Sequence, residues 1–201
     1  IGLGFMFAPN HHSAMKHAVG PRKEMATRTI FNLLGPLTNP ANAKRQVMGV
    51  FHQKWLRPIA EVLKALGSEH VMVVHSEDGL DEISIAAPTY VAELKDDVIS
   101  EYKISPEEFG IPLQSVQTLQ ANDASESLVL IKTALEGKGK INPARDIVAL
   151  NAGAAIYVSG IADTLAEGVN IAEDVIGGGT AKVKMSELAS FTRCFMSNDS
   201  L

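Results

Sequence analysis

The pattern that most constrains the fold is a strand, a helix and a second strand between residues 47 and 74. Residues 47–51 (VMGVF) form an apolar run of strand length, and residues 71–74 (VMVV) form another that is too short for a helix and too apolar for a loop. Between them, apolar residues recur at the spacing of one helical face until Gly67: Trp55, Ile59, Val62, Leu63 and Leu66. A strand–helix–strand unit predicts two parallel neighbouring strands joined by a right-handed crossover.

The chain then predicts a hairpin followed by a helical region. Residues 89–94 and 98–102 flank Lys95-Asp96-Asp97, which favours a β-hairpin added to the sheet. We expect a single helical turn over residues 105–110 and four further helices, one from the cap at Asp123 to Leu135, one starting at Pro143, one near 164–175 and one near 182–195. The predicted fold is one α/β domain over residues 1–201, with a mostly parallel central sheet, the hairpin addition and flanking helices.

Composition excludes several classes of protein. The 201 residues are 46% hydrophobic, which is enough for a proper core. A net charge of −5 argues against a general nucleic-acid binder, and no apolar run is long enough to span a membrane. The lone Cys194 cannot form an internal disulfide, which suits a reducing, cytoplasmic compartment.

An acidic stretch, Asp78-Gly79-Leu80-Asp81-Glu82-Ile83-Ser84, follows the second predicted strand. Ligands of open α/β sheets gather outside the carboxyl ends of the strands, and carboxylates crowded there repel one another unless water or a cation screens them. Mg²⁺ suits such a place because it takes oxygen ligands and completes its shell with water and substrate phosphates. Taken alone, the stretch is also what a solvated surface turn looks like, and on these residues by themselves that simpler interpretation is preferred.

Basic side chains gather early in the chain and favour binding of an anion. They are Lys16, Arg22, Arg28 and Arg45, near His11 and His12. Arginine is the side chain that grips a carboxylate with two parallel hydrogen bonds. Adjacent histidines on a helix point about 100° apart and seldom share one metal ion, so a pocket-wall or capping role is expected for them.

Other catalytic patterns are missing from the sequence. There is no Ser-His-Asp order, no CxxC pair and no HExxH, so protease and zinc chemistry have little support. Gly177-Gly178-Gly179 lacks the strand–loop–helix setting of a phosphate loop. Residue chemistry alone therefore leads to an α/β domain with a possible anion and metal site.

Two longer motifs resemble those of one enzyme family, the anthranilate phosphoribosyltransferases. The first is residues 11–16 (HHSAMK), then Arg22, then residues 28–41 (RTIFNLLGPLTNPA); the second is the acidic stretch at residues 78–84. The helix around Asn151-Ala152 and the ending Phe191-Thr192-Arg193 also fit, so the resemblance covers essentially the whole chain.

The resemblance implies an activity and a set of site residues. The family transfers the phosphoribosyl group of phosphoribosyl pyrophosphate (PRPP) to the amine of anthranilate, a step of tryptophan biosynthesis. It implies that Asp81 and Glu82 hold Mg²⁺ bound to the pyrophosphate. The anthranilate pocket would contain Arg22 paired with the carboxylate, shaped by His12, Gly35 and Pro36, with His11 and Arg28 as weaker assignments.

The chain departs from the family pattern at its start. The glycine-rich pyrophosphate loop of the form GTGGD and a Lys-His-Gly-Asn segment are absent, and in the family both precede the position of Ile1, together with a small helical domain that makes the dimer contact. We therefore expect an N-terminally incomplete chain with little activity alone and a homodimer when full-length. Two alternatives stay open: an enzyme like a pyrimidine nucleoside phosphorylase, and a non-catalytic relative that binds an anion.

Overall fold

The computed structural model describes residues 1–6, 35, 37–136 and 142–195, and the chain divides into two compact units, Ile1–Ala43 and Lys44–Leu201. In the first unit, residues 1–6 have no regular structure. The Gly35 carbonyl accepts hydrogen bonds of 3.2 Å from both the N–H and the hydroxyl of Thr38. These two bonds close a turn between Gly35 and Thr38.

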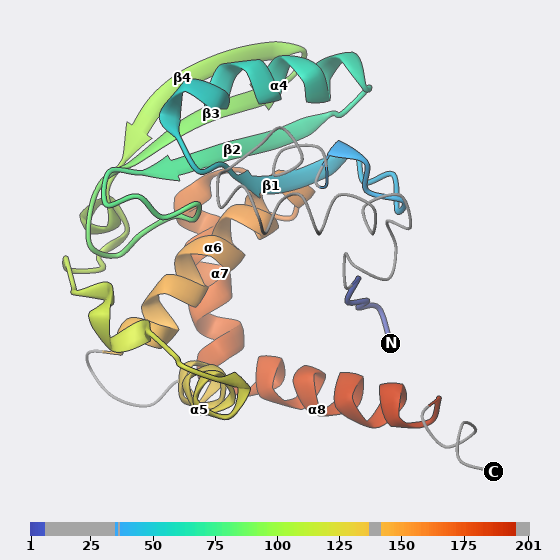
Figure 1. Ribbon diagram of the computed structural model, residues 1–201, viewed down its shortest axis with the longest axis vertical. Coiled ribbons are helices and arrows are strands. Elements are labelled where there is room, and N and C mark those ends of the chain that lie inside the picture. The colour runs from blue at the N-terminus through green and yellow to red at the C-terminus, as the bar shows by residue number, and fades with distance from the viewer. Residues whose placement is uncertain (7–34, 36, 137–141, 196–201) are drawn as a thin grey trace, which may run out of the picture. The chain divides into compact units, whose positions relative to one another are not determined.

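The second unit contains a four-stranded sheet in the order β1-β2-β3-β4 (Figure 1). Its strands are β1 (Arg45–Gly49), β2 (His70–Ser76), β3 (Thr89–Lys95) and β4 (Val98–Ile104). β1 and β2 are parallel and are joined through the 3-10 turn η2 (Gln53–Trp55) and helix α4 (Leu56–Ala65). The predicted strand–helix–strand unit is confirmed.

The sheet is mixed, so the expectation of a mostly parallel sheet needs correction. Among the described residues one pair is parallel, β1–β2, and two are antiparallel, β2–β3 and β3–β4. A parallel neighbour for β2 would need a crossover of a dozen or more residues, usually a helix. Residues 77–88 contain no helix and turn the chain back, so the predicted hairpin pairs antiparallel with β2. The α/β class and the hairpin are confirmed.

Helices cover both faces of this sheet (Figure 1). α4 packs on one face through residues at the i, i+3, i+4, i+7 spacing of one helical stripe: Leu56, Ile59, Ala60 and Leu63. α6 (Pro143–Ser159) and α7 (Leu165–Gly177) lie on the other face. Burial on both faces explains why residues 71–74 are apolar without alternation.

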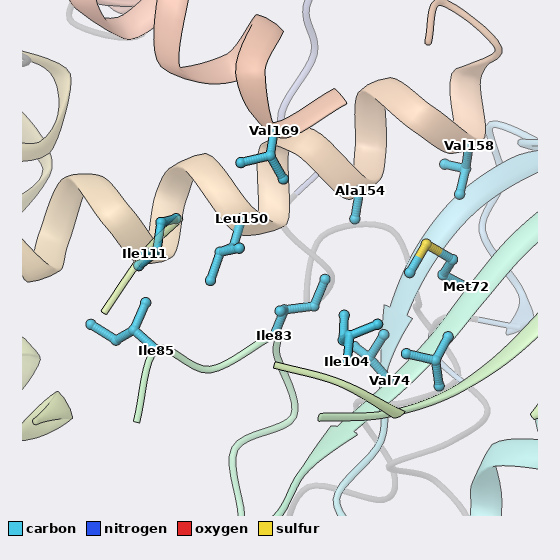
Figure 2. Close-up of a cluster of buried hydrophobic side chains, with 11 residues drawn as sticks. Met72, Val74, Ile83, Ile85, Ile104, Ile111, Leu150, Ala154, Val158 and Val169 are labelled. Carbon is cyan, nitrogen blue, oxygen red and sulfur yellow. The ribbon is translucent and has the colours of Figure 1, made fainter. Parts of the chain in front are cut away.

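The core on the α6 side joins the sheet to the segment that follows β2 (Figure 2). Met72 and Val74 of β2 meet Leu150 and Ala154 of α6, and the side chains of Ile83 and Ile85 project into the same cluster. Ile83 is 2% exposed and Ile85 0% exposed. Burying one such side chain contributes about 1.5–3 kcal/mol, so the chain just after Glu82 is fixed by its own packing.

The remaining elements confirm the predicted helical region. They are η3 (Pro106–Phe109), η4 (Val116–Leu119), α5 (Ala124–Leu135) and α8 (Thr180–Arg193). Side chains cap three of the helices: Asp123 accepts from Ser125 and Glu126 N–H, Asn142 from Arg145 N–H, and Thr164 from Glu167 N–H. No helix within the described ranges is both long and apolar enough to cross a membrane.

α6 and α7 approach each other closely because glycines face the contact. A Cβ added to Gly153 would lie 2.6 Å from the backbone of Val169, and one added to Gly168 would lie 2.3 Å from the Gly153 carbonyl oxygen. The small residues around Gly153 therefore serve helix packing.

Candidate active site

The acidic stretch begins with a tight turn at the carboxyl end of β2. The Gly79 N–H donates to the Ser76 carbonyl at 3.0 Å, and Gly79 has a φ of +94°, which side chains disfavour. The Asp78 carboxylate accepts the Leu80 N–H at 3.2 Å and the Ser84 hydroxyl at 2.5 Å. Asp78 thus closes the loop on itself, which leaves Asp81 and Glu82 as the carboxylates available to a ligand.

Asp81 and Glu82 are both exposed, at the edge of the sheet where β1 and β2 end. Partial desolvation raises the pKa of Glu82 above its ordinary value, and the neighbouring negative charge of Asp81 raises it further. Two carboxylates that repel each other at the carboxyl end of parallel strands form a place where a cation is favoured. The acidic pair therefore lies at the carboxyl edge of the sheet, the position that the sequence predicted.

A backbone contact with β1 holds one end of this segment. An ideal Cβ at Gly49 would lie 1.6 Å from the Asp81 carbonyl oxygen, so the two backbones touch at a distance that only glycine permits.

A side chain of α6 holds the other end. Asn151 Oδ1 accepts the Ile83 N–H at 3.0 Å, while its Nδ2 donates to the Ile83 carbonyl at 2.9 Å and to the Ile147 carbonyl at 2.9 Å. The sequence predicted a helix around Asn151 but not this contact. The available signal was one amide in a helical run of small and apolar residues.

A pocket of about 370 Å³ opens beside the acidic pair. Asp81 and Glu82 line it together with mainly apolar residues of η4, α5 and α6, among them Leu119, Ile131 and Ile147. The carboxylates therefore stand at the border between an apolar wall and solvent.

The acidic pair fits a magnesium ion that shares its ligands with a substrate. Mg²⁺ is commonly held through one or two carboxylates, with waters and phosphate oxygens completing the shell. Within the described ranges, no group of three or more His, Cys, Asp or Glu side chains could hold a metal ion alone. Asp81 and Glu82 would thus supply part of a ligand set, which suits a metal that arrives with a phosphorylated substrate.

The other predicted site residues divide between described and undescribed parts of the chain. Gly35 belongs to the first unit, in the turn that Thr38 closes. The remaining predicted anthranilate-binding residues lie outside the described residues: His11, His12, Arg22, Arg28 and Pro36. Their roles, like those of Asp81 and Glu82, stay predictions.

Arg45, one of the basic residues considered for the anion site, lies elsewhere. It begins β1, at the opposite end of the strand from Gly49. Its guanidinium pairs with Glu69 at 3.2 Å and donates to the Ser159 carbonyl at 3.0 Å, at the end of α6. Arg45 therefore stabilises a helix end and is not part of the acidic site.

An α/β sheet with two exposed carboxylates at its carboxyl edge places these side chains where folds of this class bind their ligands. Residues 1–182 match the model of the glycosyl transferase family, a/b domain, and the chain belongs to that family. It is 92% identical over 201 residues to an anthranilate phosphoribosyltransferase of a Marinomonas species, covering 100% of this chain and 58% of that relative. The chain thus spans somewhat more than half the length of the curated relatives it matches.

Solved structures have the same fold. The anthranilate phosphoribosyltransferase of Thermus thermophilus is 40% identical, with a TM-score of 0.86, over 94% of this chain and 56% of that one. The Saccharomyces cerevisiae enzyme in complex with PRPP and Mg is 25% identical, with a TM-score of 0.76, over 87% and 50% of the two chains.

Proposed function

We propose that the protein containing this chain transfers the phosphoribosyl group of PRPP to the amine of anthranilate. The products are N-(5-phosphoribosyl)anthranilate and pyrophosphate, in tryptophan biosynthesis. One observation carries the proposal. This chain is 92% identical to an anthranilate phosphoribosyltransferase, and its own structure has an exposed Asp81–Glu82 pair at the carboxyl edge of the sheet.

In this proposal Asp81 and Glu82 hold a magnesium ion. When bound, Mg²⁺ neutralises the negative charge that develops on the departing pyrophosphate. The chain's contribution is to hold the backbone of both residues in one place before substrate arrives, which reduces the rearrangement that the reaction needs. The yeast enzyme solved with PRPP and Mg supports the choice of metal.

Arg22 pairs with the anthranilate carboxylate in this proposal, and His12, Gly35 and Pro36 shape the pocket, with His11 and Arg28 nearby. The amine nitrogen forms a bond to the ribose C1, the bond from C1 to the pyrophosphate oxygen breaks with its electron pair, and the nitrogen loses one proton to solvent. An aromatic amine is nucleophilic when neutral, so no dedicated general base is assigned. Orientation of the two substrates supplies much of the rate enhancement.

The test follows the loss of anthranilate fluorescence with PRPP and Mg²⁺, using the full gene product that carries this chain. The double variant Asp81→Asn, Glu82→Gln is expected to lose roughly 100-fold or more in kcat/KM. The matched control is Glu173→Gln, Asp174→Asn, an adjacent acidic pair on α7 with the same change of charge. The control is expected to retain parental activity.

Two outcomes would each contradict one part of the proposal, the reaction or the metal ligands. A parent without metal-dependent consumption of anthranilate would exclude the transferase, and phosphorolysis of a pyrimidine nucleoside would then be measured. An active double variant would keep the transferase and move the metal to other ligands.

Homodimer formation and a cytoplasmic location stay proposals, and light scattering of the full gene product tests the first.

A further inference from the structure

Within the part of the chain that the structure describes, the Asp81 and Glu82 side chains have no partner that fixes their direction. The contacts that restrain Asp78 do not reach them: no hydrogen-bond donor or cation of the described residues holds either carboxylate, and the charge that acts on Glu82 is that of Asp81. The backbone of residues 81–83 therefore decides which positions the two carboxylates can reach. Whatever fixes that backbone controls the acidic pair.

Asn151 fixes the backbone of this segment by two hydrogen bonds to Ile83. Its amide pairs with both the N–H and the carbonyl of Ile83, as a neighbouring strand would. The Ile83 N–H belongs to the peptide unit that also contains the Glu82 carbonyl, so this bond fixes the plane of the peptide next to the ligand residue.

The amide is itself held, because its Nδ2 also donates to the Ile147 carbonyl one turn earlier in α6. Its neighbours on the same helix, Leu150 and Ala154, are 1% and 0% exposed. Asn151 thus transmits the position of a packed helix to a loop. Figure 2 shows Ile83 beneath Leu150 of that helix, in the same cluster.

We propose that Asn151 is a positioning residue for the acidic pair: its amide holds the Ile83 backbone so that Asp81 and Glu82 face one metal ion. This inference rests on the proposed function, in which that ion is Mg²⁺ bound with PRPP. Gly49 restrains the same segment from β1, through its contact with the Asp81 carbonyl. The carboxylates are therefore positioned from two elements that lie on either side of them in the sequence.

The test replaces Asn151 by serine. A serine in a helix can donate to the carbonyl four residues earlier, so Asn151→Ser can keep the bond to Ile147 while losing both bonds to Ile83. Asn151→Ala, which loses all three, is the second variant. Asn142→Ala is the matched control: it removes an amide that caps the same helix and does not touch residues 81–83.

Two measurements are made on the full gene product. The first is binding of Mn²⁺ in the presence of PRPP, from the electron paramagnetic resonance signal of the free ion. The second is the Mg²⁺ concentration that gives half-maximal activity. We expect Asn151→Ser to weaken both by about 10–100-fold, the usual effect of losing a group that orients a metal ligand. Asn142→Ala is expected to lower the urea midpoint and leave both unchanged.

Each outcome decides the inference separately from the proposed function. A folded Asn151→Ser protein whose Mn²⁺ affinity stays within about twofold of the parent would overturn the positioning role, as would an equal loss in Asn142→Ala. A parent that binds Mn²⁺ with PRPP but consumes no anthranilate would overturn the proposed reaction alone. If both Asn151 variants fail to fold, the same titrations on Gly49→Ser decide: unchanged affinity contradicts control of the carboxylates by the backbone.

Discussion

At the scale of single residues, one buried carboxylate that several donors hold, Glu93, lies away from the proposed site. Glu93 is 7% exposed and accepts hydrogen bonds of 2.8 Å from His70 Nε2, Tyr102 OH and Tyr157 OH. Desolvation acts to raise the pKa of Glu93, but these hydrogen bonds together lower it below the ordinary value. Because three donors hydrogen-bond to this carboxylate, the folded structure stabilises its charged form.

We expect Glu93→Gln to lower the free energy of unfolding at pH 7 by about 1–3 kcal/mol, because an amide cannot accept all three donors. The folded-state pKa of Glu93 is lowered, so its stabilisation is present above the unfolded pKa of 4.5 and is lost as the pH falls through the folded value. Urea unfolding should therefore show a smaller difference between parent and variant at about pH 3.5 than at pH 7. Glu173→Gln on α7 serves as control, and a difference independent of pH would contradict this account.

The residue scale also shows what the sequence could predict about the site. Asp81 and Glu82 follow an apolar run and a Gly79 turn, and these signals all lie within residues 71–82. Asn151 acts on a segment 68 positions away, so no local pattern could reveal its partner. Local patterns predicted the carboxylates that we propose as ligands, whereas the contact between Asn151 and Ile83 is visible only in the folded chain.

At the scale of elements, the contact between α6 and α7 depends on the absence of side chains. We expect Gly153→Ala to lower the free energy of unfolding by about 1–3 kcal/mol, because the added methyl group meets the Val169 backbone at 2.6 Å. Gly177→Ala is the control: a Cβ there has no heavy atom within 4 Å, and stability should be unchanged or slightly higher. Urea midpoints measure both. A neutral Gly153→Ala would mean that the two helices can separate.

Element types were predicted more reliably than their arrangement. Apolar runs, glycine stops and capping residues identified β1, α4, β2, the hairpin and helices α5 to α8. The direction of the hairpin was not predicted, because strand direction depends on whether residues 77–88 cross over or turn back. Periodicity describes one element at a time and contains little information about which edge of a sheet the next strand joins.

At the scale of the whole molecule, α8 differs from the other helices. None of its residues is buried, unlike α4 to α7, and Phe191 near its end and Phe195 just beyond it are 47% and 70% exposed. Within the second unit it extends past α5, to which it is tied by the Lys182–Glu136 ion pair at 3.0 Å (Figure 1).

We expect Phe191→Ser and Phe195→Ser to leave the free energy of unfolding of the 201-residue chain within about 0.5 kcal/mol of the parent, because exposed side chains contribute little. The same substitutions should reduce binding of a dye that fluoresces on apolar surfaces. Urea unfolding and dye titration measure the two effects. A loss of stability of about 2 kcal/mol would show that both rings pack against the protein.

The two hydrogen bonds between the Asn151 amide and the Ile83 backbone, called the clamp below, also have a consequence for the order in which the chain folds. The hairpin and the β1–α4–β2 unit close over short stretches of chain, whereas the clamp joins positions 68 residues apart. Contacts of such separation carry a larger entropic cost of closure and form after local ones. We therefore expect the proposed metal site to be completed only when α6 docks, and a chain stalled before that step to have a formed sheet edge but a weakened affinity for the metal.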